Sequence, residues 1–278
     1  MSIKFDIVIY HKGCQDGFAS AYVAHKVLGN NAKYVPMSYY EKINFYKNKK
    51  ILVCDFSFEE EIVKKLLKNK NVVYIIDHHK TAVEKLKNIS KKHKLIDLSH
   101  SGAYLTWKYF YPKKKIPLFI KLIEDYDIWT FKHEETRPFN VSVALLPYSF
   151  TRWEKLEDDD YVNKLVKKGK IIMIYQNNII ARECKKCKIK KQIINEKEYK
   201  IAYKNTTCCI NEIGNELVKN KNCDFAVCYY YEDSTDSTKF SLRSIDDKTD
   251  VSEIAKIYGG GGHRNASGVT KKGLHNSI

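Results

Sequence analysis

Short apolar runs that alternate with helix-like segments constrain the fold of this chain most strongly. Three such runs lie at 5–10, 51–54 and 72–76. Each precedes a segment with apolar residues at helical spacing, at 18–28, at 58–68 and from about residue 81. Strands that alternate with helices predict a mostly parallel sheet flanked by helices, and continuous apolar strands fit burial on both faces. The expected fold class is therefore α/β.

The pattern changes after a Lys-rich amphipathic segment at 161–182, which predicts a long helix. Beyond this segment the sequence predicts a hairpin at 189–203 that turns near residues 195–196, a helix near 212–219, strands near 225–231 and 239–243, and a last helix before Gly259. We therefore expect a first domain at 1–160, a helical connector at 161–186 and a smaller α/β domain at 187–278.

The chain is strongly basic. Its 278 residues include 49 Lys and Arg against 33 Asp and Glu, a formal net charge of +16, which favours polyanionic partners such as nucleotides, RNA, DNA or polyphosphate. No run approaches the roughly 20 apolar residues of a membrane span, and the first residues lack the apolar segment of a signal peptide. The eight cysteines do not resemble a disulfide scaffold. We expect a soluble, cytoplasmic protein with no membrane partner.

Polar side chains follow the apolar elements along the first half of the chain. They are His11 and Asp16, then Asp55, then Asp77 with His78 and His79, and finally Asp125 and Asp127 after an apolar segment at 117–124. Because parallel strands end at one edge of a sheet, these side chains are expected to converge. Imidazole and carboxylate groups together suit Mn, Fe or Zn. The pattern predicts a metal site, whereas each short run alone fits a solvated strand end equally well.

Four consecutive glycines at 259–262 precede His263 and Arg264. Glycines let backbone amides approach an anion closely, and the following His and Arg side chains supply charged donors for a phosphate. A plain glycine linker would lack such donors. The sequence therefore predicts a phosphate-binding segment near the C-terminus.

Two further patterns stay ambiguous. Residues 101–103 at a helix start would present amide donors to a phosphate or form a plain N-cap, and the N-cap is favoured. Cys184 and Cys187 have the spacing of a zinc pair, but no second pair with regular spacing accompanies them. Free thiols are therefore favoured over structural zinc.

The sequence resembles the DHH phosphoesterases, a family that holds RecJ-type exonucleases, oligoribonucleases, cyclic-dinucleotide phosphodiesterases and family II pyrophosphatases. The motifs that carry the resemblance are HKGCQDG at 11–17, VCD at 53–55, DHH at 77–79 and IED at 123–125. GGGH at 260–263 resembles the DHHA1 domain that accompanies DHH domains, and SLRS at 241–244 resembles a strand of that domain. The resemblance covers nearly the whole chain, and it implies that 1–160 is the catalytic domain and 187–278 the substrate-binding domain.

The resemblance also implies roles for individual residues. The implied metal ligands are His11, Asp16, Asp55, His78 and Asp125, with Asp55 bridging two ions. His79 would lie beside the substrate phosphate, and Asp77 would orient its neighbours. The implied substrate-binding residues are Arg243, Gly260, Gly261, Gly262, His263, Arg264 and Ser267.

Two positions leave the ligand set open. Many relatives carry Asp where this chain has Cys14, which either ligates a metal or packs as a small apolar residue. The number of metal ions is therefore either one or two. Asp125 fits the family motif better than Asp127, which would instead hold the loop that carries Trp129, but Asp127 remains an alternative ligand.

The resemblance implies a phosphohydrolase in which one or two divalent ions, Mn²⁺ or alternatively Mg²⁺, activate a water for attack on phosphorus. The expected substrates are nucleotides or short oligonucleotides cleaved in the manner of an exonuclease. Two alternatives stay open: an exopolyphosphatase-like hydrolase of phosphoanhydrides, and a non-catalytic module that binds nucleic acid or nucleotides. The oligomeric state is open, a homodimer included.

Overall fold

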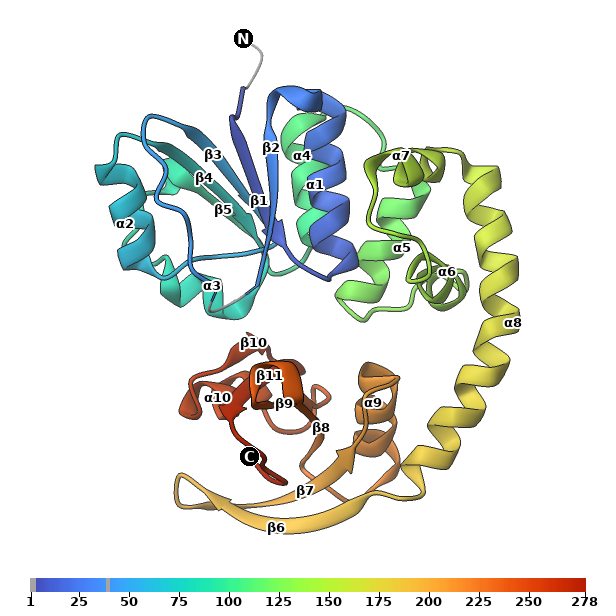
Figure 1. The fold of residues 1–278 in the computed structure, drawn as a ribbon. Helices are drawn as coiled ribbons and strands as arrows, with labels where there is room; N and C mark the ends of the chain where they lie inside the picture. The colour runs from blue at the N-terminus through green and yellow to red at the C-terminus, as the bar shows by residue number, and fades with distance from the viewer. Residues whose placement is uncertain (1–3, 39–40) are drawn as a thin grey trace. The chain divides into compact units, whose positions relative to one another are not determined.

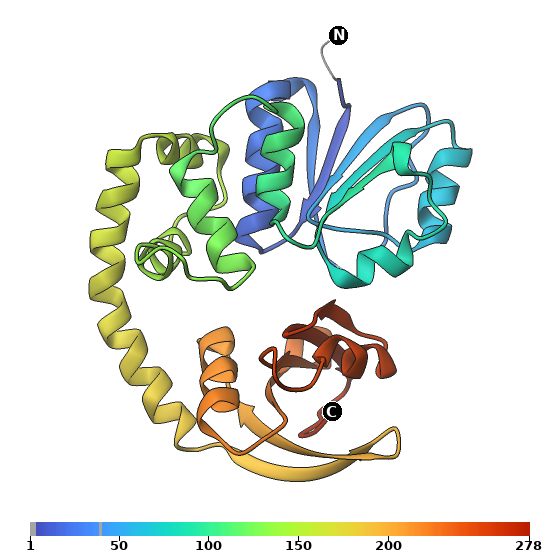
Figure 2. The same cartoon turned by 180° about the vertical axis from the view of Figure 1, so that it is seen from behind.

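A computed structural model describes residues 4–38 and 41–278 (Figures 1 and 2). The chain divides into two compact units, Met1–Met173 and Ile174–Ile278, each with its own sheet. The boundary falls inside the long helix α8 (Asp159–Cys184), which covers most of the segment expected as a connector. The division into a catalytic domain, a connector and a substrate-binding domain stays a prediction.

The first unit is built on a parallel five-stranded sheet, which confirms the predicted α/β class. Its strands are β1 (Ile7–His11), β2 (Lys33–Met37), β3 (Lys50–Cys54), β4 (Val72–Asp77) and β5 (Lys94–Ile96). They lie in the order β2-β1-β3-β4-β5 and all pair in parallel. The carboxyl ends of β1, β3 and β4 therefore lie side by side in the middle of one edge.

Helices cover both faces of this sheet (Figure 1). They are α1 (Gln15–Leu28), α2 (Glu60–Lys68), α3 (Lys80–Lys85), α4 (Gly102–Phe110), α5 (Leu118–Asp127), α6 (Thr136–Val143) and α7 (Phe150–Trp153), with 3-10 turns at Gly29–Asn31, Lys91–His93 and Glu154–Glu157. Helices α1 and α4 lie on one face, and α2 and α3 lie on the other. Both views show α5, α6 and α7 beside α1.

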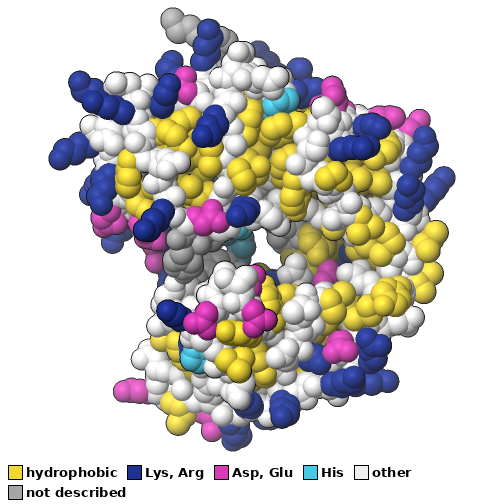
Figure 3. Space-filling view, in the orientation of Figure 1, with side chains coloured by type: hydrophobic (Ala, Val, Ile, Leu, Met, Phe, Trp, Pro, Cys, Tyr) yellow, Lys and Arg dark blue, Asp and Glu magenta, His cyan; other side chains and the backbone are white. Residues whose placement is uncertain are grey.

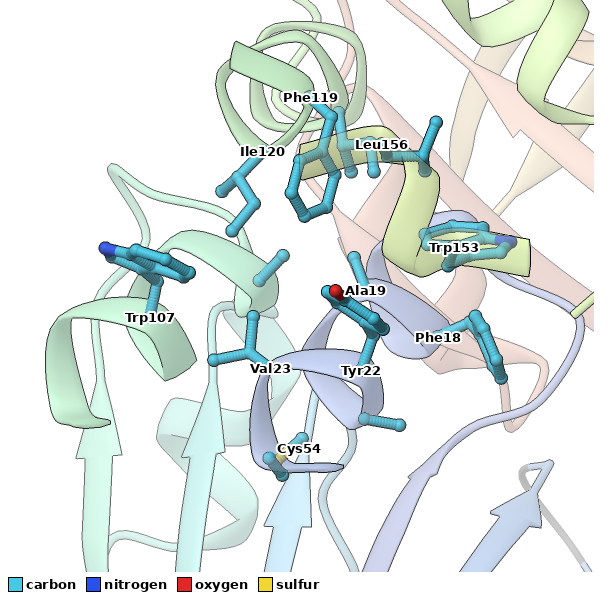
Figure 4. Close-up of a cluster of buried hydrophobic side chains, with 14 of the residues drawn as sticks. Phe18, Ala19, Tyr22, Val23, Cys54, Trp107, Phe119, Ile120, Trp153 and Leu156 are labelled. Atoms are coloured by element: carbon cyan, nitrogen blue, oxygen red, sulfur yellow. The ribbon is translucent and has the colours of Figure 1, made fainter. Parts of the chain in front are cut away.

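Alternate residues of the strands enter two separate apolar cores, one on each face. On the α1 and α4 face, Val8, Leu52 and Ile76 pack in a large aromatic core that includes Phe18, Trp107 and Trp153 (Figure 4). On the other face the core is built from residues such as Ile9, Val53 and Ile75. Because both faces are covered, the strands read as continuous apolar runs in the sequence.

The second unit contains a six-stranded mixed sheet. Its strands are β6 (Lys188–Ile194), β7 (Lys197–Asn205), β8 (Phe225–Glu232), β9 (Ser237–Arg243), β10 (Gly261–His263) and β11 (Ala266–Lys272), in the order β10-β11-β9-β8-β7-β6. Its helices are α9 (Ile210–Asn220) and α10 (Val251–Ile257), with a 3-10 turn at Asp233–Thr235. Strands β7 and β8 pair in parallel, and the other neighbours pair antiparallel.

The hairpin predicted at 189–203 is confirmed, because β6 and β7 pair antiparallel around Asn195 and Glu196. Both turn residues have positive φ, 48° and 66°, as a tight two-residue hairpin turn requires. Strands β10 and β11 were not expected, since their sequence is rich in glycine and polar residues and carries no β-strand pattern.

Three surface and side-chain properties bear on the expectations from composition: the spread of basic residues, the state of the cysteines and the polarity of the helices. Lys and Arg side chains are spread over the face shown in Figure 3 and are not gathered into one patch. All eight cysteines are free. Within the described residues, every helix is too short or too polar to cross a membrane.

Candidate metal centre

The carboxyl ends of β1, β3 and β4 bring most of the sequence-predicted site residues together. His11 is the last residue of β1, Asp55 directly follows β3, and Asp77 is the last residue of β4. His78 and His79 follow before α3 begins. Convergence at this edge was the expectation, because the three strands are parallel neighbours.

Asp16 joins the cluster because glycines allow two helices to approach the sheet edge closely. A Cβ atom on Gly17 would lie 2.4 Å from the backbone oxygen of His11, so only glycine fits there. Asp16 is 1% exposed and accepts hydrogen bonds from the backbone N–H groups of Gly102 (2.7 Å) and Ala103 (2.9 Å) at the start of α4. These amides therefore orient a protein carboxylate, while Ser101 caps the helix by accepting from the Tyr104 N–H at 3.3 Å.

Asp55 has a strained backbone. Its φ is 53°, in the left-handed region that a non-glycine residue rarely adopts. Its N–H still donates to the Ile76 carbonyl at 2.9 Å, so the strand ladder continues up to the strained residue. Backbone strain of this kind costs of order 1–3 kcal/mol and is concentrated at functional sites. Here it holds the Asp55 carboxylate between the histidines.

His78 lies at the centre of one group of ligands. Its Nε2 atom lies 3.0 Å from Asp55 Oδ1, 3.3 Å from Asp127 Oδ2 and 3.6 Å from Asp16 Oδ2. Asp55 directly follows β3, Asp127 ends α5 and Asp16 lies in the first turn of α1. Asp16, His78 and Asp127 offer ligand atoms that all lie within 4.8 Å of one another.

A second group combines His11, Asp55 and His79, again with ligand atoms within 4.8 Å of one another. Asp55 connects the two groups, because its Oδ2 lies 3.4 Å from His11 Nδ1 while its Oδ1 faces His78. His79 Nδ1 lies 3.9 Å from Asp55 Oδ1. The structure thus places His79 among the ligand atoms, whereas the sequence resemblance implied a place beside the substrate phosphate.

Asp77 supports the neighbouring histidines. The side chain is fully buried, and its Oδ1 lies 2.7 Å from His79 Nδ1 and accepts from the His78 N–H at 2.7 Å. Its Oδ2 accepts from the Ser57 hydroxyl. Asp77 thereby fixes the orientation of His79, the supporting position that the sequence predicts.

Asp125 and Asp127 are not placed as the sequence predicts. The buried Asp125 accepts hydrogen bonds from the Lys132 N–H (2.8 Å), the His133 N–H (3.1 Å) and the hydroxyls of Thr130 and Thr136. It therefore holds the loop after α5, which carries Trp129. Side chains two positions apart on an α-helix point in directions that differ by about 200°, so only one of Asp125 and Asp127 faces the cluster. That residue is Asp127, and we carry Asp127 rather than Asp125 into the proposed ligand set.

Cys14 lies at the start of α1 and is half-buried. Burial, together with the charges of Asp55, Asp127 and Asp16, raises the pKa of its thiol well above the ordinary range. Cys14 belongs to none of the potential ligand groups within residues 4–38 and 41–278. The geometry thus favours a neutral thiol at the edge of the cluster.

The carboxylates are crowded in a way that suits a cation. Burial and the charges of Asp55 and Asp127 raise the pKa of Asp16 well above its usual range. Burial and the Asp55 charge likewise raise the pKa of Asp127, although His78 opposes this. Asp55 Oδ2 and Asp127 Oδ2 are buried and accept no hydrogen bond from the described residues. Buried oxygens without donors, next to imidazole nitrogens, fit a divalent metal ion.

Two of the predicted substrate-binding residues of the second unit, Arg243 and His263, lie at the ends of strands. Arg243, at the end of β9, donates to the Leu242 carbonyl at 2.7 Å and to the Asn211 side chain. Gly214 of α9 packs on it, since a Cβ there would lie 2.6 Å from Arg243 Cγ. His263 ends the short strand β10.

Arg264 and Ser267 have structural contacts that the sequence did not indicate. The Arg264 guanidinium donates to the carbonyls of Ile245 (3.1 Å), Asp246 (2.6 Å) and Lys248 (3.0 Å). The buried Ser267 hydroxyl donates to the His263 carbonyl at 2.8 Å. Both side chains therefore shape the glycine segment, and a phosphate-binding role for them stays a prediction.

Gly260 and Gly262 are sterically required. A Cβ on Gly260 would lie 2.1 Å from the Gly268 oxygen, and one on Gly262 would lie 2.6 Å from the Ala266 oxygen. The Gly260 N–H donates to the Ala255 carbonyl at 2.8 Å, and Gly261 and Gly262 pair with β11. Close packing of β10 on β11 is thus one physical reason for this run of glycines.

Sequence reasoning missed two contributors to the metal centre. Ser57 orients Asp77, and nothing in a single serine after a strand signals that contact. Gly102 makes room for two ligands, since a Cβ there would lie 2.7 Å from Asp55 Cβ and 2.8 Å from Asp16 Oδ2. The signal for Gly102 was the small-residue helix start at 101–103, for which the sequence favours a plain N-cap, with an external phosphate as the alternative, and gives no indication of Asp16.

Comparison with known proteins identifies two relatives of the chain. No family model matches it. It is 33% identical to an uncharacterized protein of Acanthamoeba polyphaga mimivirus, over 98% of this chain and 68% of that protein. It is also 25% identical to the oligoribonuclease NrnB of Bacillus subtilis, over 71% of this chain. The chain covers 52% of NrnB, about half the length of that relative.

Two solved structures share the fold. An exopolyphosphatase-related protein from Bacteroides fragilis superimposes with a TM-score of 0.52 at 15% identity, covering 98% of this chain and 87% of that chain. A pGpG-specific phosphodiesterase from Vibrio cholerae gives 0.50 at 12% identity, covering 96% and 93%. The shared fold, the oligoribonuclease relative and the motifs at 11–17, 53–55 and 77–79 agree with one another: the chain has the fold of these two phosphohydrolase-related structures, and its motifs resemble those of the DHH phosphoesterases.

Proposed function

We propose that this chain is a divalent-metal-dependent phosphohydrolase that cleaves phosphodiester or phosphate ester bonds of nucleotides or short oligonucleotides. One observation carries the proposal: the Nε2 atom of His78 lies within 3.6 Å of carboxylate oxygens from Asp16, Asp55 and Asp127. A buried set of nitrogen and oxygen donors with an excess of carboxylates suits a divalent cation.

The proposed ligands form two neighbouring sets. Asp16, His78 and Asp127 form one, and His11, Asp55 and His79 form the other. The contacts of Asp55 to both sets support a bridging role and two ions. Mn²⁺ is the proposed ion, because it accepts both imidazole and carboxylate ligands, and Mg²⁺ is the alternative.

The bound ion supplies Lewis-acid chemistry, which lowers the pKa of a water molecule and polarises a phosphoryl oxygen. The protein contributes orientation and burial. The amides of Gly102 and Ala103 hold Asp16, and the strained backbone of Asp55 fixes its carboxylate. Preorganised ligands of this kind reduce the reorganisation needed during the reaction.

Asp77 and His79 act together in this proposal. The 2.7 Å contact between Asp77 Oδ1 and His79 Nδ1 orients the ring and favours a proton on Nδ1. His79 then contributes to the metal set, or its ring faces a phosphoryl oxygen, and the buried Asp77 supports it in either position. No covalent intermediate with the enzyme is required.

The second unit is proposed to hold the phosphorylated substrate. The candidate contacts are Arg243 and His263, with the backbone of the glycine segment 260–262. Arg264 and Ser267 support that segment through their bonds to backbone carbonyls. In this scheme residues 1–160 carry the catalysis, 161–186 connect, and 187–278 bind substrate.

A reducing compartment, the cytoplasm, is the proposed location. All eight cysteines are free, and Cys54, Cys184, Cys223 and Cys228 are buried. Proteins that work in oxidising compartments commonly pair such residues.

The substrate class is tested with a panel of short RNA, short DNA, pAp, cyclic dinucleotides and polyphosphate, each with Mn²⁺ and with Mg²⁺. Mn²⁺-stimulated release of 5'-mononucleotides from short RNA is the expected result, and the oligoribonuclease relative supports it. If polyphosphate is the only substrate and phosphate is released from it, the proposed nucleotide hydrolase would be wrong and the chain would be an exopolyphosphatase. Tight binding of RNA without turnover would show a non-catalytic binding module.

A further inference from the structure

Three aromatic side chains lie together at the end of α5 and in the loop that follows it. We call Tyr126, Trp129 and Phe131 the Trp129 cluster. The centroid of the Trp129 ring lies 4.6 Å from that of Phe131 and 5.2 Å from that of Tyr126. All three residues are partly exposed, and within the described residues none of them packs in either apolar core of the first unit. Burial in a core therefore does not explain this cluster.

Trp129 occupies a backbone position that glycine usually takes. Helix α5 ends in a Schellman motif, in which the Trp129 N–H donates to the Tyr126 carbonyl at 3.1 Å and the Thr130 N–H donates to the Asp125 carbonyl at 3.0 Å. The residue at the Trp129 position of this motif has left-handed φ, and the φ of Trp129 is 61°. Glycine adopts such a φ without steric cost, whereas a bulky residue is strained there. Backbone strain of this kind is concentrated at functional sites.

The loop is fixed in this conformation by Asp125. Phe131 is strained as well, with a φ of 49°. Between the two strained residues, the Thr130 hydroxyl donates to Asp125 Oδ1 at 2.5 Å, and the Lys132 N–H donates to the same oxygen at 2.8 Å. A loop that is already held in place loses less conformational entropy when a ligand binds. The two rings on this loop are thus preorganised.

The indole of Trp129 has no parallel stacking partner in the described part of the chain. Its ring neighbours Tyr126 and Phe131 are inclined to it by 63° and 72°, so these contacts are edge to face. Phe131 already has the Arg137 guanidinium 4.3 Å from its ring centre, in a cation–π contact. Trp129 is therefore the member of the cluster best suited to stack on a flat ligand.

The chain places this indole beside the metal centre. Trp129 lies two residues after Asp127, so at most about 7 Å separates their Cα atoms. Asp127 Oδ2 lies 3.3 Å from His78 Nε2, within the proposed ligand set. In a nucleotide one ribose separates the phosphate from the base. A nucleotide with its phosphate at the metal centre therefore has its base within reach of Trp129.

We propose that the Trp129 cluster is a base-stacking subsite, in which a nucleobase stacks on Trp129 while the phosphate of the same nucleotide is held at the metal centre. This inference rests on the proposed function and narrows its substrate class to compounds that carry a base. Stacking uses the π face that every base has, so the subsite accepts all bases. Polyphosphate has no base and gains nothing from it.

The test compares two substrates that share a backbone. They are a short RNA and an abasic oligomer of the same length with the same ribose-phosphate chain, both hydrolysed by the full chain in Mn²⁺. We expect kcat/KM of the wild type to be about tenfold or more higher for the RNA, because stacking stabilises the bound RNA. Since both substrates need the same metal centre, the ratio of the two kcat/KM values does not change when only the metal centre is perturbed.

Trp129→Leu and Trp129→Phe form a matched pair of variants. Both place an apolar L-residue at the strained position, but only phenylalanine can stack. We expect Trp129→Leu to lose most of the preference for RNA, through a higher KM for the RNA, and Trp129→Phe to keep at least about a third of it. Tyr175→Leu is the control, because Tyr175 is an aromatic residue of α8 that is 71% exposed. This control should keep the preference of the wild type.

A binding measurement separates this inference from the hydrolase function. Calorimetry with Ca²⁺ in place of Mn²⁺ compares 5'-AMP with ribose 5-phosphate, and it needs no turnover. We expect AMP to bind the wild type about tenfold more tightly, and Trp129→Leu to lose this difference. If that result is obtained while no substrate is hydrolysed in Mn²⁺, the subsite stands and the hydrolase function fails. If RNA is hydrolysed but Trp129→Leu keeps the preferences of the wild type for RNA and for AMP, the subsite is overturned and the hydrolase function stands.

Discussion

The Nε2 atom of His78 lies 3.3 Å from Oδ2 of Asp127, the last residue of α5. This contact joins the DHH motif at the end of β4 to the C-terminal end of α5. Asp125, only two positions earlier, points into the loop after α5 and is occupied by four donors. The two acidic residues therefore have different structural roles.

Asp127→Asn and Asp125→Asn form a matched pair that separates these roles. Asp127→Asn should reduce metal-dependent hydrolysis by about a hundredfold or more, because it removes a proposed ligand. Its stability in metal-free buffer should equal or exceed that of the wild type, because one buried like charge is removed. Asp125→Asn should instead lower the free energy of unfolding by about 2 kcal/mol or more, because an amide cannot accept from all four donors.

Urea unfolding in EDTA and initial hydrolysis rates in Mn²⁺ measure both effects. The opposite outcome, full activity in Asp127→Asn together with inactive but fully stable Asp125→Asn, would return the ligand role to Asp125.

Gly102→Ala tests whether the start of α4 sets the geometry of the ligands. The added Cβ would lie 2.7 Å from Asp55 Cβ and 2.8 Å from Asp16 Oδ2, so both carboxylates must shift. We expect affinity for Mn²⁺ to fall by about tenfold or more, measured by calorimetry. Gly268→Ala is the control, because a Cβ there meets only the Phe240 oxygen at 3.8 Å. Equal Mn²⁺ affinity in both variants would show that Gly102 is not needed for the site.

Buried thiols in the second unit predict a loss of stability at alkaline pH. Burial raises the pKa of Cys228 to about 12, although Arg243 opposes this. Between pH 9 and 12 the thiol then ionises in the unfolded chain but stays neutral in the folded protein. The contribution of Cys228 to the free energy of unfolding is therefore fully present below about pH 9. Above that pH it falls by up to about 1.4 kcal/mol per pH unit.

Cys228→Ala should make the fall of unfolding free energy between pH 8 and 10 shallower, and Cys208→Ala, at an exposed position, should leave it unchanged. Urea titrations at several pH values measure the slopes. Identical slopes in Cys228→Ala and the wild type would contradict the buried-thiol explanation.

The sequence predicted the first sheet and its functional edge because the signals are local. Apolar runs mark β1, β3 and β4, and the polar residues that end them are brought together by parallel pairing alone. His11, Asp16, Asp55 and His78 could therefore be grouped before the structure was known.

The choice between Asp125 and Asp127 could not be made in the same way. It depends on the rotation of α5 about its axis, which is set by packing of Phe119, Leu122 and Ile123 against the core. Arg264 posed a similar problem, since its partners are the backbone carbonyls of Ile245, Asp246 and Lys248, in a loop 16 to 19 residues earlier in the chain. The identity of one residue does not indicate contacts of this kind. The charge of Arg264 was therefore the only signal, and it suggested a ligand-binding role.

The most direct test of the central claim compares the hydrolysis of a short RNA by the wild type and by His78→Ala. We expect the wild type to be inactive in EDTA and active once Mn²⁺ is added. His78→Ala should remain folded by circular dichroism and lose about a hundredfold or more of the Mn²⁺-dependent rate. Undiminished hydrolysis in EDTA, or wild-type activity in His78→Ala, would contradict a metal-dependent mechanism at this site.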